Sequence, residues 1–306
     1  MSESRDFLTL SDFDRKTLDL LLDLATTLKD AWRKGRPEPR LAGKVLGLMF
    51  MKPSLRTRIS FEVGMRQLGG HALYITDQEV GLGKRESIHD VGNVMSRFLD
   101  GIMIRTFAQS QVEELAQHSS IPIINGLTDL VHPCQVFCDL LTTRENGFDL
   151  DAIKVVYLGD GNNMVNSWID AACAYNFEFV FSGPEGYDPD AATLARAKGR
   201  RVSIVRSPEE AIRGAQVVYT DTWTSMGQEA EAEKRRKVFP PYQLNAKLLK
   251  LADPKAIVLH CLPAHRGEEI TDEVMDGPQS VVFDQAENRL HGQKAILAWA
   301  LGGHGE

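Results

Sequence analysis

Two hydroxyl groups and a guanidinium within one helical turn form the first group of side chains that could do chemistry. Ser54, Arg56 and Thr57 follow a short apolar run and open a helical pattern, with Ser54 as the expected N-cap. The backbone N–H groups and the positive dipole end of such a helix attract anions, and arginine binds phosphate through paired hydrogen bonds. A phosphate site and an ordinary capped helix explain this segment about equally well.

Two further strand ends in the first half of the chain carry polar groups. Residues 102–104 lead to Arg105, and residues 121–127 lead through a short loop to His132 and Gln135. Positioned donors of these types polarise a carbonyl and stabilise a developing oxyanion. A lone histidine is more often structural, but three polar strand ends together favour a site.

The second half contains a glycine-rich turn at Gly159 to Asn163, directly after an expected strand. It resembles a dinucleotide-binding turn, but Met164 stands where the third glycine belongs, and the next strand ends without an acidic residue. Asparagine also favours turns for local reasons. The turn therefore argues against a nucleotide site and leaves open whether its asparagines bind a polar ligand.

Asp221 ends one later strand, and His260 and Cys261 end another. Adjacent strand residues point to opposite faces, so His260 is badly placed to activate Cys261 as a nucleophile. We therefore expect no covalent thiol mechanism. Considered alone, Cys261 would be a small buried apolar residue.

Alternating strand and helix patterns must position these groups. A first amphipathic helix covers about residues 18–32, with Ser11 as its expected N-cap and Gly35 and Pro37 beyond its end. The expected strands are residues 45–51, 71–75, 101–105, 121–127, 154–158, 178–181, 201–205, 216–220, 256–260 and 280–283. This order predicts an α/β fold with two doubly wound parallel-sheet domains and the active site in the cleft between them.

The polar segment from Thr142 to Asp151 is the best domain boundary. We expect a first domain at residues 1–147 and a second at 148–306, with a C-terminal helix at about 285–301 packing back on the first. Residues 228–237 are expected to form either a solvated helix or a mobile cover.

Composition limits the class of protein. The chain has 306 residues, 43% of them hydrophobic, and a net charge of -7, which indicates a folded protein with small-molecule partners and no nucleic acid. No apolar run suits a membrane helix and no secretory signal opens the chain, so we expect a cytoplasmic protein. Four dispersed cysteines predict reduced thiols. A metal near Cys134, Cys138 and His132 would need further ligands, and we expect none.

Taken together, these segments resemble the ornithine carbamoyltransferase family over nearly the whole chain and in family order. Residues 54–58 resemble its Ser-Thr-Arg-Thr-Arg motif, residues 132–135 its His-Pro-x-Gln motif, and Arg105 its strand-end arginine. Aspartate carbamoyltransferases share these three. The features typical of the ornithine branch are Asp221 with Ser225, Met226 and Gly227, the run His260 to Pro263, Asn163 and Arg289.

The resemblance implies that the chain moves a carbamoyl group from carbamoyl phosphate to L-ornithine, giving citrulline and phosphate. We expect this to serve arginine biosynthesis, and the sequence leaves the reverse reaction in arginine breakdown open. The resemblance also implies a homotrimer, or a multiple of trimers, without metal or cofactor. The residues implied to hold carbamoyl phosphate are Ser54, Leu55, Arg56, Thr57, Arg105, His132 and Gln135, with Cys261, Leu262 and Arg289 from the second domain. Those implied to hold ornithine are Asn163, Asp221, Ser225 and Met226. We assign catalytic roles to Arg56, Arg105, His132 and Cys261.

Two positions depart from the family pattern. Leu55 replaces the usual threonine, where a backbone N–H can serve instead. Gly81 replaces a glutamine or histidine that reaches a neighbouring subunit in many relatives, and Lys84 or another residue of 81–85 could substitute.

Three alternatives remain at this point. One is a carbamoyltransferase for another amine or amino acid, such as aspartate, putrescine or an acylated ornithine. A second, of a different class, is a nucleotide-binding oxidoreductase. The third is a catalytically silent regulator on the same scaffold.

Overall fold

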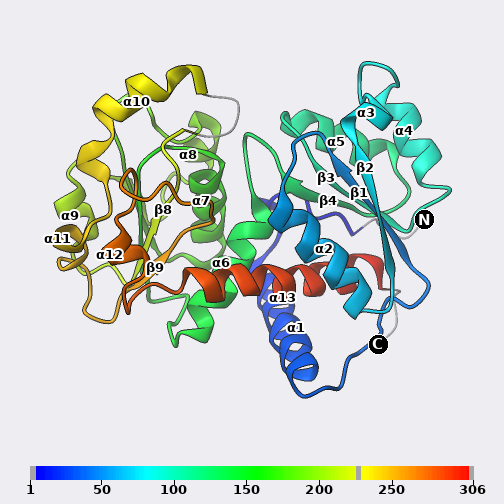
Figure 1. The fold of residues 1–306 in the computed structure, drawn as a ribbon, viewed down its shortest axis with the longest axis horizontal. Coiled ribbons are helices and arrows are strands. Elements are labelled where there is room, and N and C mark those ends of the chain that lie inside the picture. The colour runs from blue at the N-terminus through cyan, green and yellow to red at the C-terminus, as the bar shows by residue number, and fades with distance from the viewer. Residues whose placement is uncertain (1–4, 225–228, 303–306) are drawn as a thin grey trace. The chain divides into compact units, whose positions relative to one another are not determined.

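The computed structural model describes residues 5–224 and 229–302, and the chain divides into two compact units (Figure 1). The first unit comprises Met1–Leu141 and Arg289–Glu306, and the second comprises Thr142–Asn288. Each unit is built around one sheet in which all strand pairs are parallel. The predicted α/β class with two parallel-sheet domains is confirmed.

The sheet of the first unit has the strand order β2-β1-β3-β4. Its strands are β1 (Val45–Phe50), β2 (His71–Thr76), β3 (Gly101–Arg105) and β4 (Ile123–Leu127). The chain moves outward from β1 to β2 and then returns to the other side of β1 for β3 and β4. This reversal makes the gap between the ends of β1 and β3 the switch point, where open parallel sheets bind ligands.

Helices cover both faces of this sheet. They are α1 (Arg15–Arg33), α2 (Leu55–Gln67), α3 (Asp77–Val80), α4 (Ile88–Met95), α5 (Gln109–His118), α6 (Pro133–Glu145) and the later part of α13 (Val282–Leu301). Met49 and Ile102 pack with Val91 of α4 and Leu115 of α5 in one buried cluster. Elsewhere, Gly292 lets α13 approach α6, because a Cβ there would lie 2.5 Å from the sulfur of Cys138.

The sheet of the second unit has the order β7-β6-β5-β8-β9. Its strands are β5 (Lys154–Leu158), β6 (Glu178–Ser182), β7 (Val202–Ile204), β8 (Val217–Thr220) and β9 (Ile257–Leu259). Its helices are α7 (Asn163–Tyr175), α8 (Ala191–Arg196), α9 (Pro208–Ile212), α10 (Ala232–Val238), α11 (Ala246–Leu249) and α12 (Asp272–Met275). The same reversal of direction places this switch point between the ends of β5 and β8.

Aromatic side chains fill one face of this second sheet. Trp168 of α7 contacts Tyr219 edge-on, with ring centroids 5.8 Å apart, and Tyr219 stacks on Tyr157 of the adjacent strand at 5.5 Å. The aliphatic cluster that includes Val156 and Val218 packs with residues of α9, α11 and α12. Two covered faces explain why β5, β8 and β9 are nearly continuous apolar runs, whereas the edge strand β7 is partly exposed.

Two local predictions were wrong. Residues 280–283 do not form a strand: Ser280 makes one isolated bridge to Val258, and α13 begins at Val282. A short apolar run fits a buried strand and a helix start equally well. The N-cap of α1 is Asp14, not Ser11, because Asp14 accepts the Thr17 N–H at 2.8 Å whereas Ser11 lies in a separate 3-10 turn, Leu10–Asp12.

Of the segment predicted as a solvated helix or a cover, residues 232–237 belong to α10, which is preceded by a 3-10 turn at Glu229–Glu231. Residue 228 lies outside the described residues. Within residues 5–224 and 229–302, none of the helices combines the length and the apolar character that a membrane crossing requires.

Lys294 is an unusual buried cation in the first unit. Only 2% of it is exposed, and its Nζ donates to the backbone oxygen of Leu28 at 3.3 Å and lies 5.7 Å from the ring centre of Trp32. Burial lowers the pKa of this ammonium from 10.5 to about 8. The folded chain therefore binds fewer protons than the unfolded chain between these two pH values, so its stability rises as the pH rises through this window.

We predict that Lys294→Met is more stable than the parent chain at pH 7, because the charged form no longer has to be buried. This advantage should shrink by up to about 3 kcal/mol between pH 8 and 10.5. Urea unfolding of both proteins across this range measures it. Lys34→Met, which removes an ammonium with 69% of its side chain exposed, should leave the pH dependence unchanged. Parallel stability curves for parent and Lys294→Met would contradict the prediction.

Candidate active site

The start of α2 has the features of an anion site. Ser54 is its N-cap, as predicted: its Oγ accepts the Thr57 N–H at 3.4 Å and lies 3.1 Å from the Thr57 hydroxyl. No acidic residue lies in the first turn, so the positive end of the helix dipole is not neutralised there. Leu55 and Arg56 are exposed beside it. This turn can hold a phosphate through its backbone, a hydroxyl and a guanidinium.

Arg289 joins two of the predicted carbamoyl-phosphate residues. Its guanidinium donates to the Oε1 of Gln135 at 2.5 Å and to the Oγ1 of Thr57 at 3.2 Å, and all three residues are at least 95% buried. The Gln135 amide is held from its other side by Asp139, at 2.9 Å. The expectation that Arg289 comes from the second domain was wrong, because α13 crosses the boundary and residues from Arg289 onward belong to the first unit.

Arg105 and His132 complete this group, which we call the donor cluster: Thr57, Arg105, His132, Gln135 and Arg289. Burial, followed by the positive charges of Arg289 and Arg105, holds the pKa of His132 well below 6.5. The imidazole is therefore neutral near pH 7 and offers a single N–H donor. A neutral imidazole beside two guanidiniums can donate its N–H to a carbonyl oxygen and polarise the carbonyl without itself being protonated first.

Lys52 is a buried residue of this region that sequence reasoning missed. It follows β1, forms an ion pair with Asp129 after β4, and its Nζ lies 4.2 Å from the ring centre of Phe107 after β3. The Asp129 N–H also donates to the Phe107 oxygen at 2.8 Å. Lys52 thus ties together the three strand ends that carry the donor cluster. A single lysine before Pro53 gives no sequence signal of such long-range contacts.

Asp221 is the centre of the predicted site in the second unit. Its Oδ1 accepts the thiol of Cys261 at 3.0 Å and the Thr222 N–H at 2.8 Å, and its Oδ2 accepts the amide of Asn162 at 3.0 Å. The ends of β8 and β9 and the turn after β5 therefore meet at one carboxylate. We call Asn162, Asp221 and Cys261 the carboxylate corner.

Asn162 was not among the predicted ligands, although its neighbour Asn163 was. Asn162 caps α7, its Oδ1 accepting the Met164 N–H at 3.0 Å and the Tyr157 hydroxyl at 3.2 Å. Asn163 is the first residue of α7. The sequence shows two adjacent asparagines but does not show which of them turns toward Asp221.

His260 acts on the backbone beside Cys261 and not on its thiol. The Nδ1 of His260 accepts the Leu262 N–H at 2.9 Å, so the proton lies on Nε2, which is 3.0 Å from Glu269 Oε1. Leu262 has a φ of 60°, an unfavourable region for leucine. The buried His260–Glu269 pair thus holds the backbone that presents Cys261 and Leu262.

Potential metal ligands come close in two places within the described residues. One group is Asp221, His260 and Cys261, and the other is His265, Glu268 and Glu269. In the first group both ring nitrogens of His260 are already engaged, so it has no lone pair for a cation. Burial raises the pKa of Cys134 to about 12, so this thiol is also a poor ligand.

Ser225 and Met226, two of the predicted ornithine ligands, lie outside the described residues. Their assignment to ornithine stays a prediction.

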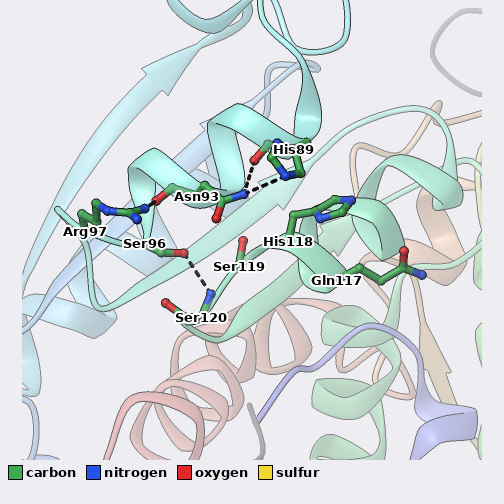
Figure 2. A pocket seen from close by; sticks show the side chains of 8 residues that line it. All are labelled: His89, Asn93, Ser96, Arg97, Gln117, His118, Ser119 and Ser120. Atoms are coloured by element: carbon green, nitrogen blue, oxygen red, sulfur yellow. Dashed lines mark hydrogen bonds between the residues drawn. The ribbon is translucent and has the colours of Figure 1, made fainter. Parts of the chain in front are cut away.

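A polar cavity of about 590 Å³ lies between α4 and α5, and none of the predicted site residues lines it (Figure 2). Figure 2 shows His89 and His118 near each other, with ring centroids 4.7 Å apart. Several lining groups serve the local chain: the Asn93 amide donates to the His89 oxygen at 2.9 Å, and the Ser120 N–H donates to the Ser96 Oγ at 3.0 Å. Helix packing thus accounts for much of the polar lining.

Comparisons with known proteins cover both units. Residues 5–145 match the family model described as the aspartate/ornithine carbamoyltransferase carbamoyl-P binding domain, and residues 151–300 match its Asp/Orn binding domain. An ornithine carbamoyltransferase of Symbiobacterium thermophilum is 54% identical over 301 residues, covering 96% of this chain and 97% of the relative.

Solved structures agree. That of an ornithine carbamoyltransferase from Pyrococcus furiosus has a TM-score of 0.95 at 46% identity, covering 99% of this chain and 98% of that one. One from Thermus thermophilus has a TM-score of 0.89 at 45% identity, covering 97% and 99%. The chain belongs to the aspartate/ornithine carbamoyltransferase family.

Proposed function

We propose that the chain transfers the carbamoyl group of carbamoyl phosphate to the side-chain amine of L-ornithine, giving L-citrulline and phosphate. The observation that carries this proposal is the near-full-length likeness to ornithine carbamoyltransferases, two of which are 54% identical to this chain. The comparisons do not favour a nucleotide-binding oxidoreductase. The contacts within each unit support a division of labour between the two substrates.

Carbamoyl phosphate suits the first unit. In this proposal its phosphate lies on the start of α2, held by Ser54, Thr57 and the guanidinium of Arg56, with the Leu55 N–H in place of a threonine side chain. Arg105 and neutral His132 point their donors at the carbonyl oxygen. Gln135 accepts a hydrogen bond from the carbamoyl NH2, and Arg289, which has only donors, holds Gln135 in place. Cys261 and Leu262 of the second unit complete the set. Two buried guanidiniums around one neutral imidazole support an anionic substrate here.

Ornithine suits the carboxylate corner. Its side-chain amine titrates near ~10.4, as lysine does, so the neutral nucleophile costs about 4 to 5 kcal/mol at pH 7. A carboxylate touching that amine would raise the cost, so we assign Asp221 to the α-ammonium and to orientation. Asn163, Ser225 and Met226 complete this site in the proposal, and Cys261 lies next to the reacting amine.

The reaction then requires one attack and one departure. The neutral amine attacks the carbonyl carbon, Arg105 and His132 stabilise the oxyanion, and Arg56 stabilises the leaving phosphate. A C–N bond forms, the C–O bond to phosphate breaks, and phosphate takes the surplus proton of the amine. No step of this scheme uses a metal or an organic cofactor.

The finer biological setting is also a proposal. Residues 1–147 form the carbamoyl-phosphate domain and residues 148–306 the ornithine domain, with the C-terminal helix returning to the first and both domains acting on one pair of substrates. The chain works as a cytoplasmic homotrimer in arginine biosynthesis. Gly81 has a left-handed backbone conformation, with a φ of 57°, and offers no side chain. Lys84 is exposed, so we assign to Lys84 the contact with a neighbouring subunit.

Substrate choice tests the function directly. Purified protein given carbamoyl phosphate should carbamoylate L-ornithine faster than aspartate, putrescine or acetylornithine, as measured by colorimetric ureido assay. Asp221→Asn should raise the KM for ornithine roughly 10- to 100-fold, the size of a lost charged hydrogen bond, and leave the KM for carbamoyl phosphate nearly unchanged. Faster carbamoylation of another amine would contradict the assignment of ornithine as the substrate.

Arg56→Ala should reduce kcat by roughly 10²- to 10³-fold and raise the KM for carbamoyl phosphate, because the leaving phosphate loses its guanidinium. Steady-state kinetics with carbamoyl phosphate varied at saturating ornithine measure both. Arg66→Ala is the matched control, since Arg66 is an exposed arginine in the last turn of the same helix. Wild-type kinetics in Arg56→Ala would remove Arg56 from the site.

Cys261→Ser should lower kcat about tenfold without abolishing it, because serine keeps a donor for Asp221 but loses the geometry of the thiol. Cys173→Ser in α7, at a half-buried position outside the site, should match the wild type. Rapid-quench mass spectrometry provides the opposing test. A carbamoylated Cys261 in the wild type, together with an inactive serine variant, would establish covalent chemistry instead.

A further inference from the structure

Arg235 is buried on an otherwise exposed helix. Its side chain is only 6% exposed, whereas its neighbours Lys234 and Arg236 on α10 point into solvent. The sequence from Glu231 to Lys237 is rich in charged residues, a pattern typical of a solvent-exposed helix, so nothing in it distinguishes this arginine from its neighbours. Burying a guanidinium costs several kcal/mol unless its donors are satisfied.

The donors of Arg235 are satisfied by three different segments. One terminal nitrogen donates to Asp160 Oδ1 at 2.9 Å and to the backbone oxygen of Trp223 at 2.7 Å. The Nε donates to Glu231 at 3.2 Å. The guanidinium carbon also lies 4.9 Å from the ring centre of Tyr187, within the range of cation–π attraction.

Two of these partners flank the carboxylate corner. Asp160 follows β5, and its backbone oxygen accepts the Asn162 N–H at 2.8 Å. Trp223 stands two residues after Asp221 and is held against Phe239, with ring centroids 5.9 Å apart. Arg235 therefore bridges the ends of β5 and β8 on either side of the Asn162–Asp221 hydrogen bond.

The charges explain why an arginine is needed at this place. Asp160 is 6% exposed, and its pKa is raised to about 6. Burial is the main cause, Arg235 opposes it, and the charges of Asp221 and Glu231 add smaller increases. Without Arg235, less positive charge would offset the repulsion between the carboxylates of Asp160 and Asp221. One carboxylate would then take up a proton, or the loops after β5 and β8 would move apart. Either change would alter the position of Asp221.

We propose that Arg235 is a positioning residue for the amino-acid substrate, bridging Asp160 and the Trp223 carbonyl so that Asn162 and Asp221 keep the geometry that binds the α-ammonium of ornithine. The inference rests on the proposed function. It adds a residue that touches neither substrate and acts through Asp221, which binds ornithine in the proposed function, and through its hydrogen-bond partner Asn162. Removing it should affect ornithine selectively, because its contacts lie within the second unit.

The test compares neighbouring arginines of one helix. Arg235→Met removes the bridge and keeps an unbranched side chain, Arg235→Lys restores the charge without the forked geometry, and Arg236→Met is the matched control. Arg236 is 61% exposed and pairs with Glu268 at 2.9 Å. The KM for ornithine and for carbamoyl phosphate, kcat, and urea unfolding midpoints are measured for each variant.

For Arg235→Met we expect a KM for ornithine at least tenfold higher and a KM for carbamoyl phosphate within twofold of the parent. Arg235→Lys should recover part of the loss, and Arg236→Met should match the parent. Asp160→Asn, which removes the same ion pair with little change in volume, should raise the KM for ornithine even if Arg235→Met folds poorly. In the Arg235→Lys background, Asp160→Asn should then raise the KM for ornithine by a smaller factor than it does in the parent protein.

Contrary outcomes separate the two proposals. A parent protein that makes citrulline, with an unchanged KM for ornithine in Arg235→Met and Asp160→Asn, would overturn the positioning role alone. Equal increases in both KM values would also overturn it, because they indicate a general loss of structure. A parent protein that makes no citrulline would overturn the proposed function and this inference together.

Discussion

Parallel pairing is the constraint on which the rest of this structure depends. In a parallel sheet all strands end at the same edge, so residues far apart in the chain meet there without a dedicated interaction. The ends of β1, β3 and β4 bring Thr57, Arg105 and His132 to one edge, and the ends of β5, β8 and β9 bring Asn162, Asp221 and Cys261 to another. The strand order puts a switch point in the middle of each set.

Buried charge is the cost of this arrangement, and hydrogen bonds offset it. Arg289 is satisfied by Gln135 and Thr57, and Arg235 by Asp160 and Trp223. Both guanidiniums fix neighbouring groups because their donors leave in fixed directions, and Arg235 also neutralises Asp160. His132 shows the opposite result: burial and two cations keep it neutral, which suits a donor for a carbonyl oxygen. Stability alone would have favoured apolar residues at several of these positions.

Much of the fold and of the site could be predicted from local pattern. Nine of the ten expected strands are present. Strands such as β1, β3 and β5 are buried on both faces and leave continuous apolar runs, whereas the edge strands β2 and β7 are partly exposed. The strand predicted at 280–283 was wrong, because the start of a helix can carry the same apolar residue types. Ser54 was identified as a cap by its position before a helical pattern. At α1 the predicted cap, Ser11, was wrong, and the hydrogen bond from the Thr17 N–H identifies Asp14 as the cap.

The sequence by itself determined the chemical types available and the order of the strand ends that carry them, because both are local properties of the chain. The tertiary structure alone decided that Arg289 joins Thr57 and Gln135, that Asn162 turns toward Asp221, and that Arg235 is buried while Arg236 is not. Each of these depends on contacts between segments dozens of residues apart. Such contacts arise when helices pack on sheets, and spacing along the chain does not encode them.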